Sequence, residues 1–325
     1  MEKRPYRSLF WPVILIGIGV IWLLGNFNII PAANINMLVN LWPVILIVIG
    51  LDMLFARRSP LAGALIAVLA IAVVIAVLAA GPALGLPAGP TLQSRTISEP
   101  IGGAESAEIS LDLSSIPTRV GSSKDRANLF EGQIDYYGTL NYNSTGNPNR
   151  RISLNHRFSG NLLTWDMFAN AQWEIGLSPD VPIDLRVDGS SGSSQFDLSG
   201  LNLTAFELDQ GSGSFTLNLP ESVQAYTARI KGGSGSLQLT LPGSGNLTVR
   251  LDGGSGSLNL NVPSGTAVRL EVIDNGSGSV NVPSWLNRVS GTGKEGVWES
   301  SNYNQAAKKL LIICEDLGSG SFNLR

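Results

Sequence analysis

The sequence Gly-Ser-Gly-Ser recurs through the C-terminal part of the chain at a nearly constant spacing. A degenerate copy begins at Ser190, and complete copies begin at Gly211, Gly233, Gly254, Gly276 and Gly318. The interval between successive copies is nearly constant, except the last, which is about twice as long. A fixed period of about 21 residues is typical of solenoids and repeat arrays, whereas a four-stranded propeller blade needs about 40 residues.

Each tetrad is followed by strict alternation of apolar and polar residues, the pattern of a strand with one buried face. The apolar positions after three of the tetrads are Phe215, Leu217 and Leu219; Leu237, Leu239 and Leu241; and Leu258, Leu260 and Val262. Proline then ends each run, because it cannot donate to a ladder. A second apolar column lies three positions before each tetrad, at Val187, Leu208, Ile230, Leu251 and Ile273.

These patterns predict an all-β domain over residues 97–325, a parallel, right-handed β-solenoid with coils of about 21 residues. Roughly ten such coils fit, and glycine at the corners is expected to supply positive φ. Residues 97–186 contain strand-like runs without a tetrad, and residues 284–309 interrupt the period as an insertion or looser coil. Phe322 and Leu324 are expected at an exposed end of the stack, without a polar cap.

The N-terminal region, 1–84, contains three apolar stretches, about 9–30, 37–55 and 61–84. Each reaches or approaches the roughly 20 residues that a helix needs to cross a bilayer. We therefore expect a three-helix transmembrane region at 1–84, a Pro/Gly linker at 85–96 and the β-domain at 97–325. Gly17, Gly19 and Gly50 suit either close helix packing or a plain lipid-facing surface, and the sequence does not decide between them.

Basic residues give the expected orientation of these helices. Lys3, Arg4 and Arg7 precede the first stretch, Arg57 and Arg58 separate the second from the third, and the 31–36 loop is uncharged. The positive-inside rule predicts a multi-pass protein of the bacterial cell membrane, with a cytoplasmic N-terminus and an extracytoplasmic C-terminal domain. Asp52 is expected to form a salt bridge with Arg57 or Arg58 rather than an ion pathway.

The first apolar stretch contains Phe10-Trp11-Pro12-Val13-Ile14-Leu15-Ile16, and the second repeats it as Leu41-Trp42-Pro43-Val44-Ile45-Leu46-Ile47. This repeat resembles the LiaI/LiaF-like transmembrane region of bacterial envelope-stress proteins. The segment Trp173–Val187, followed by the tetrads, resembles the toastrack or putative-adhesin β-repeat domain. The resemblance implies a bacterial cell-envelope membrane protein that regulates a histidine-kinase system.

The residues point to no catalytic, cofactor-binding or metal-binding site. His156 is the one histidine, and its neighbours Arg151, Arg157 and Asp166 match no known spacing, so a structural role is favoured. The one cysteine, Cys314, lies in an apolar run and is expected to be a buried small hydrophobe. The corner aspartates Asp188, Asp209, Asp252 and Asp274 are expected to form turns rather than a calcium site.

Residues 91–325 carry 17 Lys and Arg and 23 Asp and Glu, so a nucleic-acid partner is not expected. The partners that fit are the lipid bilayer, a membrane histidine kinase and an envelope glycan. The sequence thus favours a non-catalytic, membrane-anchored envelope protein that takes part in envelope-stress sensing or regulation through protein or glycan binding. The alternative is a structural or adhesin-like surface protein that self-associates through the solenoid, and an enzyme on a β-helix ranks last.

Overall fold

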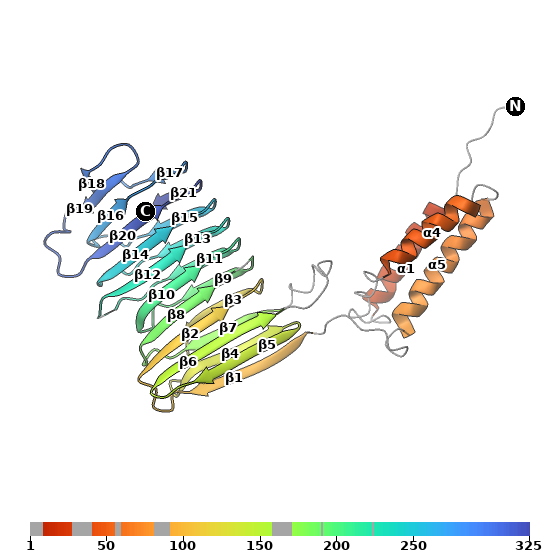
Figure 1. Cartoon of the computed structure of the whole chain (residues 1–325), viewed down its shortest axis with the longest axis horizontal. Helices are drawn as coiled ribbons and strands as arrows, with labels where there is room; N and C mark the ends of the chain where they lie inside the picture. The colour runs from red at the N-terminus through yellow and green to blue at the C-terminus, as the bar shows by residue number, and fades with distance from the viewer. Residues whose placement is uncertain are drawn as a thin grey trace. The chain divides into compact units, whose positions relative to one another are not determined.

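The computed structural model describes residues 9–27, 41–55, 60–80, 92–157, 171–189, 191–222 and 224–325. The helices belong to one compact unit and the strands to a second (Figure 1). The prolines of the expected linker, Pro87 and Pro90, lie outside the described residues. The first strand begins at Gln93, inside the segment expected as linker, because its pairing with a later strand starts before Ile97.

The helical unit contains α1 (Phe10–Asn26), α4 (Trp42–Phe55) and α5 (Pro60–Ala80). Pro12 and Pro43 lie in the first turns of α1 and α4, where a missing N–H breaks no helical hydrogen bond. A Cβ on Gly17 would overlap the Ile71 side chain of α5, so this glycine allows the two helices to approach. Gly19 and Gly50 have no such neighbour within 4 Å.

Among the described residues, one helix is long and apolar enough to cross a membrane, Leu61–Ala80, with a mean hydropathy of 3.1. α1 has 17 residues and α4 has 14, which at about 1.5 Å per residue falls short of the roughly 30 Å of hydrocarbon. The remainders of the first two predicted spans lie outside the described residues. Among the described residues, the structure therefore shows an apolar helical unit with one helix of membrane-spanning length.

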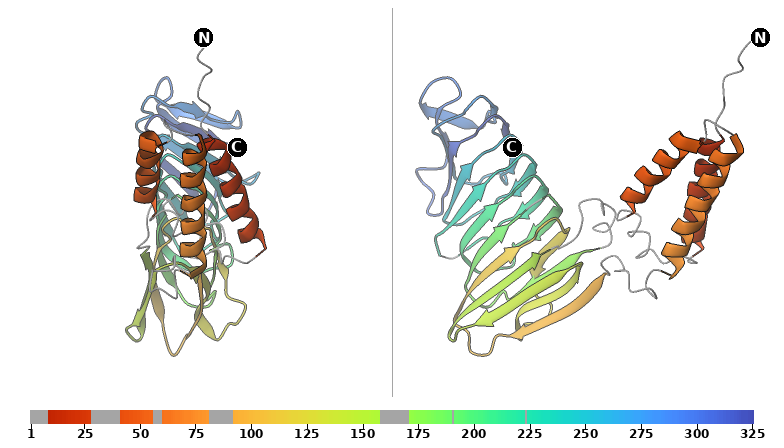
Figure 2. Two further views of the ribbon diagram at one scale, coloured as in Figure 1. Left: turned by 90° about the vertical axis from the view of Figure 1, so that its right-hand side faces the viewer. Right: turned by 45° about the vertical axis from the view of Figure 1, so that its right-hand side comes forward.

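The second unit is a large all-β domain made of two sheets (Figures 1 and 2). Sheet A has ten strands in the order β1 (Gln93–Pro100), β4 (Asn128–Tyr136), β7 (Trp173–Leu177), β3 (Thr118–Ser122), β9 (Ser193–Asp197), β11 (Ser214–Asn218), β13 (Ser236–Thr240), β15 (Ser257–Asn261), β21 (Ser321–Leu324) and β17 (Ser279–Asn281). Sheet B has eleven strands in the order β18 (Leu286–Ser290), β19 (Gly296–Ser300), β16 (Val268–Val272), β20 (Leu310–Asp316), β14 (Leu247–Asp252), β12 (Tyr226–Lys231), β10 (Leu203–Asp209), β8 (Ile183–Asp188), β2 (Ser106–Asp112), β6 (Asn149–Arg157) and β5 (Thr139–Thr145).

The core lies between the two sheets, and its middle follows the sequence repeat. A strand of sheet B and the next strand of sheet A together make what we call a rung, such as β10–β11. Ser214 pairs in parallel with Ser193 and Ser236, and Ser236 with Ser257, so neighbouring rungs are offset by one sequence repeat. The inward side chains Leu217, Leu239 and Leu260 are each 0% exposed. Apolar side chains of successive rungs thus stack into one shared core.

The C-terminal rungs do not follow chain order. β20 lies between β14 and β16, and β21 lies between β15 and β17, so the last rung of the chain is an interior rung. The last tetrad follows the previous one in the sequence after a doubled interval, but it does not lie beyond it in the stack. Gly318 lies between Gly254 and Gly276. Phe322 and Leu324, expected at an exposed end, are 1% and 3% exposed because strands cover both sides of β21.

The expected apolar column is wrong at its last position. Val187, Leu208, Ile230 and Leu251 are buried, but Ile273 is 61% exposed because β16 ends at Val272. Cys314 continues the column in its place, paired with Leu251 on one side and with Val272 on the other. In the last two rungs, the buried column position therefore lies four residues before the tetrad, at Cys314 and Val272, instead of three.

Residues 97–186 do not form sequential parallel coils. The rung β2–β3 lies between β8–β9 and β6–β7, and strands β1, β4 and β5 pair antiparallel at that end. Residues 284–309 contain the antiparallel pair β18 and β19, which closes the other end beside β16 (Figure 2). Tertiary pairing at both ends therefore replaces the uniform stack of roughly ten coils expected from the period.

The glycines of the tetrads are needed mainly because the backbones of neighbouring rungs approach closely, and less because of a positive φ. Gly211, Gly276 and Gly318 have positive φ, whereas Gly233, Gly235 and Gly256 do not. A Cβ on Gly235 would overlap the carbonyl oxygen of Gly213 on the neighbouring rung. The corners are instead joined by backbone hydrogen bonds, such as Ser257 N–H to the Gly235 carbonyl at 3.1 Å.

Candidate functional site

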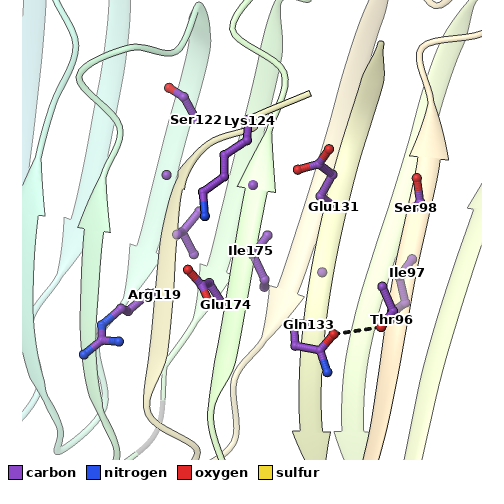
Figure 3. A pocket seen from close by; sticks show the side chains of 14 residues that line it. Thr96, Ile97, Ser98, Arg119, Ser122, Lys124, Glu131, Gln133, Glu174 and Ile175 are labelled. Carbon is purple, nitrogen blue, oxygen red and sulfur yellow. Dashed lines mark hydrogen bonds between the residues drawn. The ribbon is translucent and has the colours of Figure 1, made fainter. Parts of the chain in front are cut away.

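A groove of about 490 Å³ lies on the outer face of sheet A, across β1, β4, β7 and β3 (Figure 3). Its polar side chains come from all four strands and from the segment that follows β3. They are Thr96, Ser98, Arg119, Ser122, Lys124, Glu131, Gln133 and Glu174. Among the described residues, no aromatic side chain lines the groove, so ligand binding there would depend on charge and hydrogen bonding.

The hollow exists because two neighbouring outward positions carry no side chain. Glu131 of β4 pairs with Gly176 of β7, and Gly176 pairs with Gly121 of β3. A Cβ on Gly176 would lie 2.9 Å from the Ser123 Cα, so glycine is required there by packing. At Gly121 the nearest atom to a Cβ would be 3.6 Å away and φ is not positive, so a small side chain would fit. Gly121 therefore keeps the groove open without being needed for the fold.

Four charged side chains surround the hollow, two cations (Arg119 and Lys124) and two carboxylates (Glu131 and Glu174). Within the part of the chain that the structure describes, none of the four forms an ion pair. Figure 3 shows Lys124 extending across the strands toward Glu174. Charges of both signs are thus available to a ligand.

Local hydrogen bonds hold two of the polar side chains in place. The Asn128 amide donates to Glu131 Oε1 at 2.9 Å and lowers the pKa of that carboxyl, because the hydrogen bond favours the ionised form. Thr96 Oγ1 donates to Gln133 Oε1 at 2.7 Å, and Gln133 Nε2 donates to Ser94 Oγ at 2.7 Å. Preformed side-chain positions reduce the ordering cost of binding.

The groove opens onto a row of polar side chains that crosses the whole of sheet A. The pairing register places one outward residue of each strand in this row, which we call the polar row. Its members, in sheet order, are Thr96, Gln133, Glu174, Arg119, Gln195, Thr216, Gln238, Asn259, Asn323 and Asn281. Strands lie about 4.8 Å apart, so the row is roughly 40 Å long.

Amide hydrogen bonds order the far end of the polar row. Asn323 Nδ2 donates to Asn259 Oδ1 at 3.0 Å, and Asn281 Nδ2 donates to Asn323 Oδ1 at 2.6 Å. Each asparagine therefore presents its remaining amide atoms in a fixed direction. The outer face of sheet A combines a charged groove at one end with a regular ladder of hydroxyl and amide groups.

Two family models match the chain. Residues 9–54 match the LiaI-LiaF-like transmembrane region. Residues 89–240 match the N-terminal domain of toast_rack, DUF2154. One match lies in the helical unit and the other in the β-domain, which we call the toast-rack domain after the family that it matches. The groove lies wholly within the matched part of the toast-rack domain, and both resemblances noted in the sequence are confirmed.

The toast-rack domain is also similar to solved structures of low sequence identity. The crystal structure of a putative cell adhesion protein from Clostridium sporogenes has a TM-score of 0.47 and 18% identity, over 72% of this chain and 98% of that one. A putative adhesin from Bacteroides fragilis has a TM-score of 0.34 and 16% identity, over 72% and 97%. No curated protein matches. A LiaI-LiaF-like region joined to a toast-rack domain fits a membrane-anchored envelope protein.

His156 is a core residue of the toast-rack domain and lies away from the groove. It is 3% exposed, its Nε2 lies 2.5 Å from the Tyr137 carbonyl oxygen, and its ring packs edge-on against Trp173. Its sequence neighbour Arg151 pairs with Glu108 at 3.2 Å. Asp166 lies outside the described residues. Among the described residues, no hydrogen bond joins the His156 ring to a nucleophile or carboxylate side chain, and the Ser114 hydroxyl donates to the His156 backbone carbonyl at 3.0 Å.

Cys314 is fully buried, and burial raises the pKa of its thiol, as expected of a small core residue.

Asp52 has a buried Oδ1 without a hydrogen-bond partner among the described residues. Its expected partners Arg57 and Arg58 lie outside those residues.

The corner aspartates divide into two kinds. Asp274 Oδ1 accepts a hydrogen bond from Gly276 N–H at 2.8 Å, as a turn-forming residue does. Asp188 lies between Asp112 and Asp209 in the register, and burial, followed by repulsion from these two carboxylates, raises its pKa. In the described part of the chain no group of three or more His, Cys, Asp or Glu is arranged to hold a metal ion.

No pattern in the sequence indicates the groove. Its residues come from the region without tetrads, and they are spread along the chain from Thr96 to Gly176. No spacing rule connects them, because β1, β4, β7 and β3 become neighbours only through the out-of-order pairing. The absence of a side chain at Gly121 carries no recognisable signal in the sequence.

Proposed function

We propose that this protein is a non-catalytic, membrane-anchored envelope protein whose toast-rack domain binds an envelope ligand on the outer face of sheet A. The binding serves cell-envelope stress sensing or regulation. The observation that carries the proposal is the continuous polar row, which ends in a groove with four charged side chains that have no ion-pair partner among the described residues. The domain content, a LiaI-LiaF-like region and a toast-rack domain, supports the envelope setting.

The ligand that this face fits best is an extended glycan bearing amine and carboxylate groups. Hydroxyl and amide groups at intervals of about 4.8 Å suit a polymer that offers repeated hydroxyl groups along its length. Arg119 and Lys124 would take the ligand's carboxylates, and Glu131 and Glu174 would take its amines. A protein partner, such as a membrane histidine kinase, is the competing ligand class, and the binding experiment below separates the two.

The middle of the toast-rack domain supports a finer description of the fold. We propose that residues 193–261 form a right-handed parallel β-solenoid with coils of about 21 residues. The parallel ladders, offset by one sequence repeat from rung to rung, support it. The two ends of the domain, with their antiparallel strands, act as caps on this solenoid.

We also propose three membrane crossings, with the N-terminus in the cytoplasm and the toast-rack domain outside. The basic residues at 3–7 and 57–58 support this orientation. Single cysteines at Asn34, Ser59 and Ser234, in a Cys314→Ala background, test it on intact cells with a membrane-impermeant maleimide. We expect labelling of Asn34→Cys and Ser234→Cys but not of Ser59→Cys. Labelling of Ser59→Cys before lysis, or protection of Ser234→Cys, would contradict the topology.

Removing the two groove cations is expected to weaken glycan binding. In co-sedimentation with purified peptidoglycan, full-length protein carrying Arg119→Ala and Lys124→Ala should bind at least about tenfold more weakly, because each charged hydrogen bond contributes about 1.5–3 kcal/mol. Gly121→Ser, which fills the hollow, should act in the same direction. Arg126→Ala is the matched control, since the Arg126 side chain is 77% exposed and pairs with Asp180, and neither residue lines the groove.

The same variants separate binding from signalling. Cells carrying Arg119→Ala with Lys124→Ala should lose the envelope-stress response as fully as cells that lack residues 97–325. Unchanged binding to peptidoglycan together with a lost response would instead favour a protein partner at the groove. Unchanged binding and an unchanged response would refute a role for this face.

A further inference from the structure

The last rung of the chain, Leu310–Leu324, fills a slot between rungs that are made earlier. β20 pairs in parallel with β14 and β16, and β21 pairs in parallel with β15 and β17. Without this rung, the edges of β14 and β15 on one side and of β16 and β17 on the other would have no strand between them. Unpaired strand edges are templates for pairing with another chain.

The slot is specific for the side chains of its own rung. Leu310, Ile312 and Cys314 are each 0% exposed, and they continue the apolar columns of the neighbouring strands. Outside the core, Arg250 Nε donates to Glu315 Oε1 at 2.6 Å. Asn323 completes the amide ladder between Asn259 and Asn281. A segment must therefore match apolar, acidic and asparagine positions at once, and the segment that does so is a copy of 310–324.

The connection that leads into this rung is a loop that returns to its starting place. Ser300 Oγ accepts a hydrogen bond from Val268 N–H at 2.9 Å, and Leu310 pairs with Val268 in the register. Residues 301–309 therefore leave β16 and come back to it. Fully extended, this loop reaches about 30 Å, enough to carry the rung to a neighbouring molecule. The ion pair of Lys308 with Glu221 at 2.9 Å is half-exposed and holds the loop weakly.

We propose that the slot is a binding site for the C-terminal rung of a second copy of this chain. Two neighbouring chains exchange residues 310–324, each rung filling the slot of the other. Every contact of the rung is the same in the exchanged pair, and the loop 301–309 alone changes conformation, which makes such exchange inexpensive. Attachment to the same membrane favours it further, because it raises the local concentration of the second copy.

Disulfide formation between two differently marked chains tests the exchange. One chain carries Asn259→Cys and the other Asn323→Cys, both with Cys314→Ala, and the full-length chains are co-expressed and oxidised in the membrane. The side chains at these positions touch through the 3.0 Å hydrogen bond, so cysteines there are within reach of each other. We expect a disulfide-linked product of twice the chain mass that contains both chains.

Two controls make the result decisive. A chain carrying Asn259→Cys and Asn323→Cys together should form the disulfide whether or not exchange occurs, which establishes that the pair can react. Thr216→Cys paired with Asn323→Cys should give no mixed product, because β13 and β15 lie between β11 and β21 in sheet A. The proposal is overturned if the mixed product is absent while the double variant closes within one chain, or if Thr216→Cys cross-links equally well.

Discussion

Truncation after Lys309 is expected to release residues 262–309 in addition to removing the last rung. β16 and β17 touch the stack through β20 and β21, so the C-terminal cap loses its platform. The rung also contributes buried apolar side chains such as Ile312 and Phe322, each of which stabilises the native state by about 1.5–3 kcal/mol. Stability in a stacked repeat depends on nearest neighbours, so the effect should stay local.

Hydrogen exchange of the full-length and truncated chains in micelles measures this prediction. Amides of β16, β18 and β19 should exchange at nearly unprotected rates in the truncated chain, whereas β9 and β11 should keep their protection. Asn323→Ala is the matched control, since it removes one outward amide and leaves the rung in place. Retained protection of β16 after truncation would mean that the cap can dock directly on β14, and that the slot closes when it is empty.

Substitution of Gly235 by alanine is expected to destabilise the middle of the toast-rack domain strongly. The new Cβ would overlap the Gly213 carbonyl oxygen, and the backbone of the neighbouring rung cannot move without breaking its own ladder. Overpacking of this kind costs about 3 kcal/mol. Exchange of the amides in β11, β13 and β15 should therefore quicken by about 100-fold.

Ser234→Ala provides the matched control for the Gly235 variant. Ser234 is the adjacent corner residue, so the substitution should change exchange rates by less than about twofold. An effect of Gly235→Ala no larger than that of Ser234→Ala would show that the corners can move apart, and that close approach does not explain the tetrad glycines.

Local patterns predicted the middle of the toast-rack domain well. The alternation at Phe215, Leu217 and Leu219 identified the buried face, because the alternation of side chains along a strand does not depend on its partners. The tetrads also marked the corners correctly, although the reason for their glycines was wrong at Gly233 and Gly235. The order of the rungs was predictable from β8 to β15, because rungs that follow each other in the chain also lie side by side there.

The sequence by itself determined the apolar helical segment, the alternation of the strands and the regular repeat of the tetrads. These are local properties that depend on hydrophobic burial and backbone geometry within one rung. The tertiary structure alone decided that β20–β21 enters between earlier rungs and that Gly121 and Gly176 meet beside Glu131. Both results depend on pairing between strands that are distant in the chain. Every rung presents similar apolar columns and similar strand edges, so the sequence of one rung does not specify its neighbours. The order of the rungs follows from the fit of the whole stack.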